Sequence, residues 1–252
     1  MADLAVVIVS WNVRELLAAC LRSLLADLES AQLATQVWVV DNNSADGSPE
    51  MVRQMFPMVR LIANDVNLGF AAGNNRALAE IQASPSDSVA AIWLLNPDTE
   101  VRPGATRALW SALRSDPHVG VAGAKLLYSD GSLQHSAFRF PGLAQLAFDL
   151  FPLPARLYET RLNGRYPRRL YEGQMPFAVD HPLGAALMVR AEALAEVGGM
   201  DEEYRLYCEE IDWCWRMHRA GWRALCAPAA VVVHHAGLST AQVPLASFVN
   251  LW

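Results

Sequence analysis

Apolar residues in the first half of the chain fall into short runs that have the length of β-strands. These runs are rich in Val, Ile, Leu and Trp and carry few charges, which is typical of strands buried on both faces. They predict five strands, at Leu4–Val9, Gln36–Val40, Val59–Ala63, Val89–Leu95 and Val119–Ala124.

The segments between these strands have apolar residues at helical spacing instead. After the first strand, apolar residues recur every three or four positions from Leu17 to Leu28. We expect further helices, one capped by Ser48, one ending near Ile81 and one over Pro103–Ser115. Because strand and helix alternate, we predict an α/β fold with a mostly parallel central sheet flanked by helices.

Polar clusters follow three of the predicted strands directly. The carboxyl ends of parallel strands share one sheet edge, where open α/β sheets bind their ligands, so we expect a nucleotide pocket there. Asp41 is able to accept a hydrogen bond from a base or a ribose, and Asp98 is placed to hold a phosphate-bearing metal. The simpler interpretation is ordinary turn chemistry. The clusters are Ser10-Trp11-Asn12, Asp41-Asn42-Asn43-Ser44 and Asn96-Pro97-Asp98.

The segment Asn67–Asn75 is predicted to be a glycine-containing loop beside this pocket. Gly69 and Gly73 have no side chains, which allows the backbone to approach a ligand closely. We include Gly69 and its neighbours Asn67 and Asn74 among the candidate ligand contacts. The segment matches neither G-x-G-x-x-G nor a P-loop, which disfavours dinucleotide and ATP binding.

The regular alternation stops after Lys125. Ser129–Ser132 predicts the turn of a small antiparallel hairpin, and residues from about 139 to 180 show no clean period. Two interpretations of this irregular stretch stay open: a solvated loop, or a patch facing an anionic lipid headgroup or a diphosphate-bearing acceptor. Its basic and aromatic residues are Arg156, Arg161, Arg165, Arg168 and Arg169, interleaved with Tyr158, Tyr166 and Tyr171.

Three acids open the last predicted helix. Asp212 has Arg216 at i+4, whereas Glu210 has no basic partner there, so Glu210 is a candidate general base. Neighbouring Glu209 and Asp212 are expected to raise its proton affinity by charge repulsion. The simpler account is that acids favour a helix N-terminus. The predicted buried side of this helix consists of Ile211, Cys214, Trp215 and His218.

A final strand, Val231–Val233, ends at two histidines, His234 and His235. A histidine pair at a strand end, beside a metal held by an acid, is a candidate ligand. The elements still to be named are a strand at Leu183–Val189 and a short helix at Ala191–Val197.

Composition restricts the class of protein. The 252 residues are 53% hydrophobic and 18% charged, enough for a packed core, and the net charge of −6 argues against a general nucleic-acid binder. The four cysteines have no C-x-x-C or zinc spacing, as expected for thiols in a reducing compartment. Signal-peptide features and apolar stretches of ~18 residues are missing, so we expect a cytoplasmic protein. Peripheral contact with the inner face of the membrane follows if the arginine-rich stretch meets lipid.

In combination, the ordered motifs resemble glycosyltransferase family 2 of the GT-A fold, in its rhamnosyltransferase-like bacterial branch. The resemblance covers about residues 4–240 and implies a single GT-A domain over 1–252. It places a nucleotide-sugar-binding half at 1–124 and an acceptor-side half, with the irregular region, at 125–252. The motifs are VVIVSWN, VVDNNSADGS, NLGFAAGNN, LLNPD, GAALMVR, GGMDEEYRLYCEEIDWCWR and HHAGLS.

The resemblance also implies residue roles. Asp98 resembles the metal-binding acid of the family's D-x-D region, where Asn96 replaces the first Asp. Glu210 resembles the catalytic base, and His234 best matches a histidine that faces the metal. Asp41 resembles the acid that recognises the base or ribose. The other expected donor contacts are Ser10, Asn12, Asn43, Asn67, Gly69, Asn74 and Asn96.

The implied reaction is inverting transfer of a sugar from a nucleoside diphosphate, with Mg²⁺ or Mn²⁺, in cell-surface polysaccharide synthesis. dTDP-rhamnose is the favoured donor and a UDP-sugar the next. A hydroxyl of a glycan or of a polyprenyl-diphosphate-linked acceptor receives the sugar. Two alternatives stay open. A sugar-1-phosphate nucleotidyltransferase would need a basic, glycine-rich loop where Ser10-Trp11-Asn12 stands. A degenerate nucleotide- or carbohydrate-binding module is suggested by Asn96 and Glu210 in place of aspartates.

Overall fold

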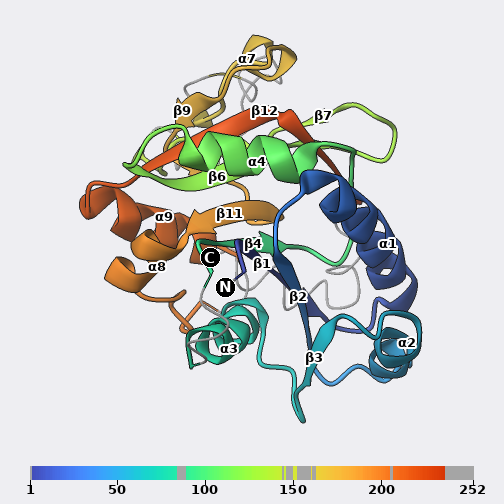
Figure 1. Ribbon diagram of the computed structural model, residues 1–252. Helices are drawn as coiled ribbons and strands as arrows, with labels where there is room; N and C mark the ends of the chain where they lie inside the picture. Colours follow the sequence, from blue (N-terminus) through green and yellow to red (C-terminus); the bar gives the residue numbers. More distant parts are fainter. Residues whose placement is uncertain are drawn as a thin grey trace.

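The computed structural model describes residues 2–83, 89–143, 145, 150–151, 160, 163–204 and 207–235. Its central feature is a ten-stranded sheet in the order β3-β2-β1-β4-β11-β6-β12-β5, with β7 paired to β6 and β9 to β12 (Figure 1). The strands are β1 (Leu4–Ser10), β2 (Thr35–Asp41), β3 (Arg60–Ala63), β4 (Ala91–Leu95), β5 (Thr99–Val101), β6 (Val119–Leu127), β7 (Leu133–Gln134), β9 (Phe177–Val179), β11 (Ala186–Arg190) and β12 (Arg223–His234). A separate small antiparallel pair joins β8 (Ala137–Phe138) to β10 (His181–Pro182).

Helices cover both faces of the sheet, and side chains that alternate along each strand feed two cores. On β1, Leu4, Val6 and Ile8 pack with α1, α2 and α4, whereas Ala5 and Val7 pack with α3, α8 and α9 (Figure 1). Strands buried on both faces therefore appear as continuous apolar runs, as the sequence predicted. The helices are α1 (Arg14–Ala31), α2 (Ser48–Met55), α3 (Phe70–Ala83), α4 (Ala105–Arg114), α7 (Arg169–Glu172), α8 (Ala191–Val197) and α9 (Glu209–Arg219).

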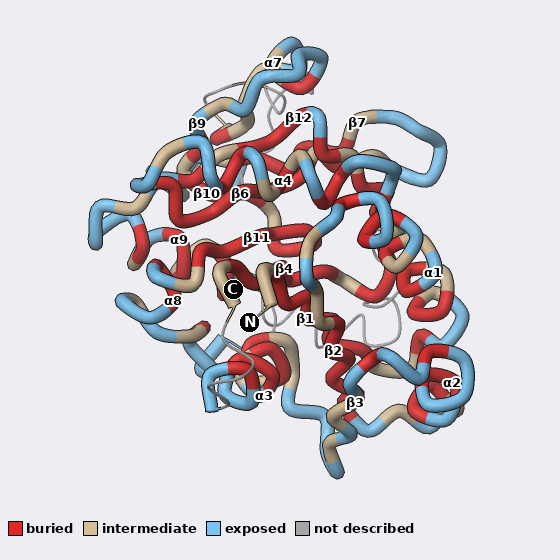
Figure 2. Tube along the Cα trace, in the orientation of Figure 1, coloured by how far each residue is buried: buried red, intermediate tan, exposed pale blue. Residues whose placement is uncertain are grey.

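The expected α/β architecture is confirmed, and the sheet is mixed. β1, β2, β3 and β4 are parallel, and so are β6 and β12. β11 is antiparallel to both β4 and β6 and separates them. Figure 2 shows the buried strands at the centre of the molecule and the exposed segments at its outer surface. β6 runs across residue 124, so the sheet itself joins the two expected halves of the chain.

Several local predictions need correction. Gly47, at φ 81°, occupies the N-cap of α2, and Ser48 is the first helical residue, donating its hydroxyl to Asp46. The last strand is far longer than Val231–Val233, because its ladder continues through an irregularity around Pro228, as proline requires. The hairpin turn before β7 is confirmed. No helix among the described residues is long and apolar enough to cross a membrane.

Candidate active site

The ends of β1 and β2 place two buried polar side chains next to each other. Ser10 and Asp41 are register partners in the parallel ladder, 1% and 2% exposed. Asp41 Oδ2 accepts a hydrogen bond from the Ser44 N–H at 2.8 Å. Asp41 Oδ1 and Ser10 Oγ have no hydrogen-bond partner within the described part of the chain. An unsatisfied buried polar group costs about 1–3 kcal/mol, so these two atoms stay candidates for ligand contacts.

Asn12 ties the turn after β1 to the turn after β2. Its N–H donates to Ser44 Oγ at 2.8 Å, and its Oδ1 accepts from the Ala45 N–H at 2.7 Å. Asn12 has φ 51°, a left-handed conformation that Asn tolerates better than most residues. Asn43, at φ 62°, exposes its side chain beside this junction. Asn12 therefore shapes the wall of the expected pocket.

Asn42, which sequence reasoning missed, holds the segment before α3 against the sheet. Its side chain is 2% exposed, donates to the Gly69 carbonyl at 2.9 Å and accepts from Asn64 Nδ2 at 2.9 Å. Asn67 Oδ1 accepts from the Gly69 N–H at 2.9 Å, and Gly69 has φ 83°. The sequence carried a signal for this role, since Asn42 directly follows Asp41 at the strand end.

The expected glycine loop is shorter than predicted, because α3 already begins at Phe70. A Cβ atom at Gly73 would lie 2.8 Å from a Val9 methyl group, so this glycine allows the helix to pack on β1. Asn74 is 1% exposed and donates to the Phe70 carbonyl at 2.9 Å. Gly73 thus serves packing, and a ligand role for Asn74 stays a prediction without support from these contacts.

Asp98 lies just beyond β4 and is fully buried. The Nε2 atom of His234, at the end of β12, lies 3.4 Å from Asp98 Oδ1. The ring of His235 turns elsewhere, with its nitrogens 2.7 Å from Ser129 Oγ and 2.9 Å from Glu100 Oε1. Of the two adjacent histidines, His234 is therefore the one that faces the carboxylate.

Asp98 and His234 offer oxygen and nitrogen donors that Mg²⁺ or Mn²⁺ accepts. The other ring nitrogen of His234 lies 3.1 Å from Gln134 Oε1, and such outer partners orient ligand histidines. In the described ranges, no group of three or more His, Cys, Asp or Glu side chains gathers to hold a metal. Mg²⁺ is usually bound by one or two carboxylates plus substrate phosphates. The residues present fit an ion that binds together with a diphosphate.

Two adjacent carboxyl groups are buried at the start of α9. Glu209 and Glu210 are 6% and 8% exposed. Burial raises the pKa of Glu210, and burial, followed by the charge of Glu210, raises the pKa of Glu209 to about 7. Asp212 accepts from Arg216 Nε at 2.8 Å, as its spacing predicted. Burial, rather than the expected repulsion from Glu209 and Asp212, is thus the main cause of the raised pKa of Glu210.

The buried side of α9 also differs from the predicted one. Trp213, Cys214 and Met217 are buried, whereas Trp215 is 46% exposed. The indole N–H of Trp213 donates to the Gly198 carbonyl at 2.8 Å, which fixes this side chain inside. The remaining residues predicted to be buried, Ile211 and His218, are half-buried and exposed.

The segment before β11 connects Glu210 to the region of Asp98. A Cβ atom at Gly184 would lie 3.5 Å from the Cβ of Glu210. The next carbonyl, that of Ala185, accepts from the Asn96 N–H at 2.9 Å. Asn96 Oδ1 is buried without a hydrogen-bond partner among the described residues. The candidate base Glu210 and Asn96, two residues before the candidate metal ligand Asp98, therefore both lie next to the segment Gly184-Ala185.

The arginine- and tyrosine-rich stretch is described only in part. Tyr171 is 1% exposed and packs edge-on against Phe177, with ring centroids 5.4 Å apart, so it belongs to the core. Arg168 and Arg169 are exposed at the start of α7. Three of the predicted residues, Arg156, Tyr158 and Arg161, lie outside the described residues.

Comparison with known proteins identifies the family of this chain. Residues 5–197 match Glycosyl transferase family 2. The chain is 33% identical over 226 residues to the N-acetylglucosaminyl-diphospho-decaprenol L-rhamnosyltransferase of Mycobacterium tuberculosis, covering 86% of this chain and 73% of that protein. A shorter match, 40% over 58 residues, to the rhamnosyltransferase WbbL of Escherichia coli covers 23% of this chain and 22% of that protein.

Solved structures share the fold at low sequence identity. The mannosyltransferase PcManGT from Pyrobaculum calidifontis, in complex with GDP-Man and Mn²⁺, has a TM-score of 0.64 at 16% identity, over 96% of this chain and 59% of that one. GalNAc-T7 with UDP, GalNAc and Mn²⁺ has a TM-score of 0.63 at 15% identity, over 93% and 44%. This chain spans about half the length of these two solved proteins. Since the match covers most of the residues that build the sheet, the chain belongs to glycosyltransferase family 2 and has the GT-A fold.

Proposed function

We propose that this protein is a metal-dependent, inverting glycosyltransferase of cell-surface polysaccharide synthesis. The sugar passes from a nucleoside diphosphate to a hydroxyl of a polyprenyl-diphosphate-linked saccharide. dTDP-rhamnose is the favoured donor because two curated relatives are named rhamnosyltransferases, and a UDP-sugar is the second choice. The acceptor class follows the name of the mycobacterial relative, which contains diphospho-decaprenol. Such an acceptor would bring the protein to the inner face of the membrane from the cytoplasm.

The observation that carries this proposal is the short link between Glu210 and the Asp98 region. Gly184 contacts Glu210, and the adjacent Ala185 carbonyl holds the Asn96 N–H. A transferase of this kind needs a base on one side of the reacting sugar carbon and a partner for the leaving diphosphate on the other. Glu210 would serve as the base, and Asp98 would hold the metal that binds the diphosphate.

The nucleoside end of the donor is assigned to the junction of β1 and β2. Asp41 Oδ1 and Ser10 Oγ are buried acceptor and donor groups there, suited to hydroxyl or N–H groups of the nucleoside. Asn12 and Asn42 fix the surrounding turns through backbone hydrogen bonds. The donor would therefore lie along the carboxyl edge of the sheet, from Asp41 to Asp98.

At the reacting carbon, the chain supplies a base and a metal site. Asp98 and His234 would hold Mg²⁺ or Mn²⁺, which neutralises charge that develops on the leaving diphosphate. The acceptor oxygen forms a bond to the anomeric carbon as the bond from that carbon to the diphosphate oxygen breaks. The proton of the acceptor hydroxyl passes to the Glu210 carboxylate, whose raised pKa makes it a stronger proton acceptor.

The proposal is tested by incubating the protein with dTDP-rhamnose or UDP-sugars, Mg²⁺ or Mn²⁺, and a synthetic N-acetylglucosaminyl diphosphate lipid. We expect release of nucleoside diphosphate and a product whose anomeric configuration, read by NMR, is inverted. Binding of the nucleotide sugar without its turnover, in the presence of that acceptor, would instead identify a degenerate binding module. A retained configuration would contradict the assignment of Glu210 as a base.

A further inference from the structure

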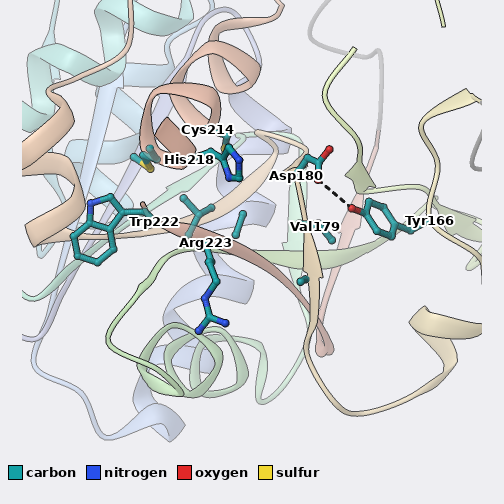
Figure 3. Close-up of a pocket in the computed structure, with 11 residues that line it drawn as sticks. Tyr166, Val179, Asp180, Cys214, His218, Trp222 and Arg223 are labelled. Carbon is teal, nitrogen blue, oxygen red and sulfur yellow. Dashed lines mark hydrogen bonds between the residues drawn. The ribbon is translucent and has the colours of Figure 1, made fainter. Parts of the chain in front are cut away.

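A pocket of about 220 Å³ lies between α9, β9 and the start of β12 (Figure 3), whereas His234 is at the other end of β12. It is smaller than the ~300–1,000 Å³ typical of sites for drug-sized ligands, so it suits one small branched group. Its inner surface is formed by aliphatic and sulfur-containing side chains, namely Val121, Ala178, Val179, Cys214, Met217 and Ala224.

Two large polar side chains at the pocket rim direct their polar atoms elsewhere. The Trp222 indole N–H donates to Glu196 Oε2 at 2.8 Å. The Arg223 guanidinium pairs with Asp116 Oδ2 at 2.6 Å. Both polar groups therefore bind residues that do not line the pocket.

The acidic group at the opposite end of the pocket is also engaged within the protein. Asp180 Oδ1 accepts from the Tyr166 hydroxyl at 3.4 Å, drawn as a dashed line in Figure 3, and Oδ2 accepts from the Phe140 N–H at 2.9 Å. The remaining polar side chain in the lining is His218, whose ring packs against those of Phe140 and Trp215, with centroids 5.8 and 6.2 Å apart. A sugar ring would need several hydrogen-bonding groups around it, whereas an apolar ligand needs none. Because most of the lining is apolar, the pocket favours an apolar ligand.

Two separate chain segments allow the distance between this pocket and Glu210 to be estimated. Along α9, Cys214 and His218 line the pocket four and eight residues after Glu210, which corresponds to ~6 and ~12 Å at 1.5 Å per residue. Along the neighbouring segment, Asp180 lines the pocket and Gly184 contacts Glu210, and four extended residues span at most ~14 Å. Both estimates place the pocket within ~14 Å of the proposed base, Glu210.

We propose that this pocket binds the first isoprene units of the lipid-linked acceptor while the acceptor hydroxyl meets Glu210. The inference rests on the proposed function. In such an acceptor the saccharide is followed by a diphosphate and then by branched, apolar five-carbon units. Its apolar part therefore begins at a distance from the reacting hydroxyl, as the pocket does from Glu210.

The rim offers a cation for the diphosphate between these two ends. Arg139 is exposed and directly precedes Phe140, whose N–H donates to the pocket residue Asp180, so the Arg139 backbone lies next to the rim. Phe140 packs edge-on against the half-exposed Trp215, with ring centroids 4.9 Å apart, which extends the apolar surface outwards.

The test fills the pocket from its exposed side. Ala178 lines the pocket from β9 and is exposed, so Ala178→Leu adds volume with little risk to the fold. Ala195→Leu, at an exposed position of α8 that does not line the pocket, is the matched control. Calorimetric titration with geranyl diphosphate and with inorganic diphosphate, both with Mg²⁺, measures how much the geranyl group contributes to affinity. We expect at least ~10-fold tighter binding of geranyl diphosphate in the wild type and the control, and loss of that preference in Ala178→Leu.

Equal binding of the two probes by the wild type, or an unchanged preference in Ala178→Leu, overturns the proposal. The proposal is also overturned if Ala178→Leu keeps the lipid preference but no longer discriminates between acceptors of different saccharide length. The pocket would then be a sugar subsite. Because the titration needs no turnover, its result can be read separately from that of the transfer assay. Pocket-dependent geranyl binding without sugar transfer supports this inference and contradicts the function, whereas transfer without lipid preference does the reverse.

Discussion

The Nε2 atom of His234 lies 3.4 Å from Oδ1 of the fully buried Asp98, and the backbone sets this contact. β12 runs antiparallel to β5 with His234 opposite Thr99, and the His235 N–H donates to the Asp98 carbonyl at 2.9 Å. Because the sheet register fixes the backbones of Asp98 and His234, we expect a conservative substitution at either residue to change the chemistry of the site and leave the backbone in place.

Replacing Asp98 with Asn should abolish sugar transfer and metal-dependent nucleotide binding. The amide keeps the shape of the carboxylate but loses its charge, so metal affinity should fall by more than the ~10–100-fold typical of losing an outer-shell partner. Titration of the nucleoside diphosphate with and without Mn²⁺ measures this. Asp130→Asn, at an exposed turn, is the control and should behave as wild type. Unchanged activity in Asp98→Asn would remove Asp98 from the metal site.

Replacing Asp41 with Ala should weaken binding of the free nucleoside diphosphate and of the sugar nucleotide alike. Asp41 Oδ1 is buried beside Ser10 at the end of the ladder, so a lost contact there is worth ~1–3 kcal/mol. Calorimetry with both ligands measures the two losses. A variant in which only the sugar nucleotide binds more weakly would mean that the donor lies in the opposite orientation.

The strands and the clusters at their ends were predictable from the sequence because each strand is a continuous apolar run closed by polar residues. Ser10 and Asp41 needed only the assumption of a parallel sheet, and the ladder bears it out. The insertion of β11 between β4 and β6 was not predictable, because an apolar run specifies neither which strands it pairs with nor whether the pairing is parallel.

Contacts between distant segments were the other gap. Nothing in the sequence relates Gly184 to Glu210, because their proximity depends on how α9 packs beside β10. Trp213 was missed as a core residue because helical spacing alone gave two plausible faces for α9. Its hydrogen bond to Gly198 selects the buried one.

Neutralising Arg165, Arg168 and Arg169 to Gln should reduce transfer to a lipid-linked acceptor and leave donor hydrolysis intact. Exposed charges act through solvent, so their contribution should fall with added salt, which screens over ~8–10 Å. Transfer to vesicle-bound acceptor at two salt concentrations measures this. Equal transfer by the variant and the wild type would assign the stretch to a solvated loop. A matched control neutralises three arginines elsewhere, Arg22, Arg53 and Arg76.

Glu209 should make the protein less stable as the pH rises. Burial, followed by the charge of Glu210, raises its pKa from 4.5 to about 7, so between these values the folded state binds the proton more tightly than the unfolded state. The free energy of unfolding therefore falls across this window and is highest below it. At pH 8, Glu209→Gln should be more stable than wild type by on the order of 1–3 kcal/mol in urea denaturation.

The control for this effect is Glu15→Gln, whose side chain is 87% exposed. It should leave the dependence of stability on pH unchanged. If the stability curves of Glu209→Gln and wild type run parallel from pH 4 to pH 8, Glu209 does not titrate in this window.

Glu210 should act as the general base, and Glu210→Gln should bind donor normally but transfer sugar ~10²–10⁴-fold more slowly. The amide keeps the size of the side chain and its place beside Gly184 but cannot take up a proton. Because burial raises the pKa of Glu210, kcat/KM in the wild type should increase with pH through a pKa above 4.5, and this limb should vanish in the variant.

Two further variants decide which acid is responsible. Glu210→Asp keeps a carboxylate on a shorter arm and should retain measurable transfer, as expected if proton uptake, rather than packing, is what the Gln variant lost. Glu209→Gln should transfer at a near-normal rate, although Glu209 is also buried with a raised pKa. The difference is geometric, since Glu210 is the acid that contacts Gly184, whose neighbour Ala185 binds Asn96. If Glu209→Gln is inactive while Glu210→Gln transfers at the wild-type rate, the base is Glu209, and the acceptor must approach from the other side of α9.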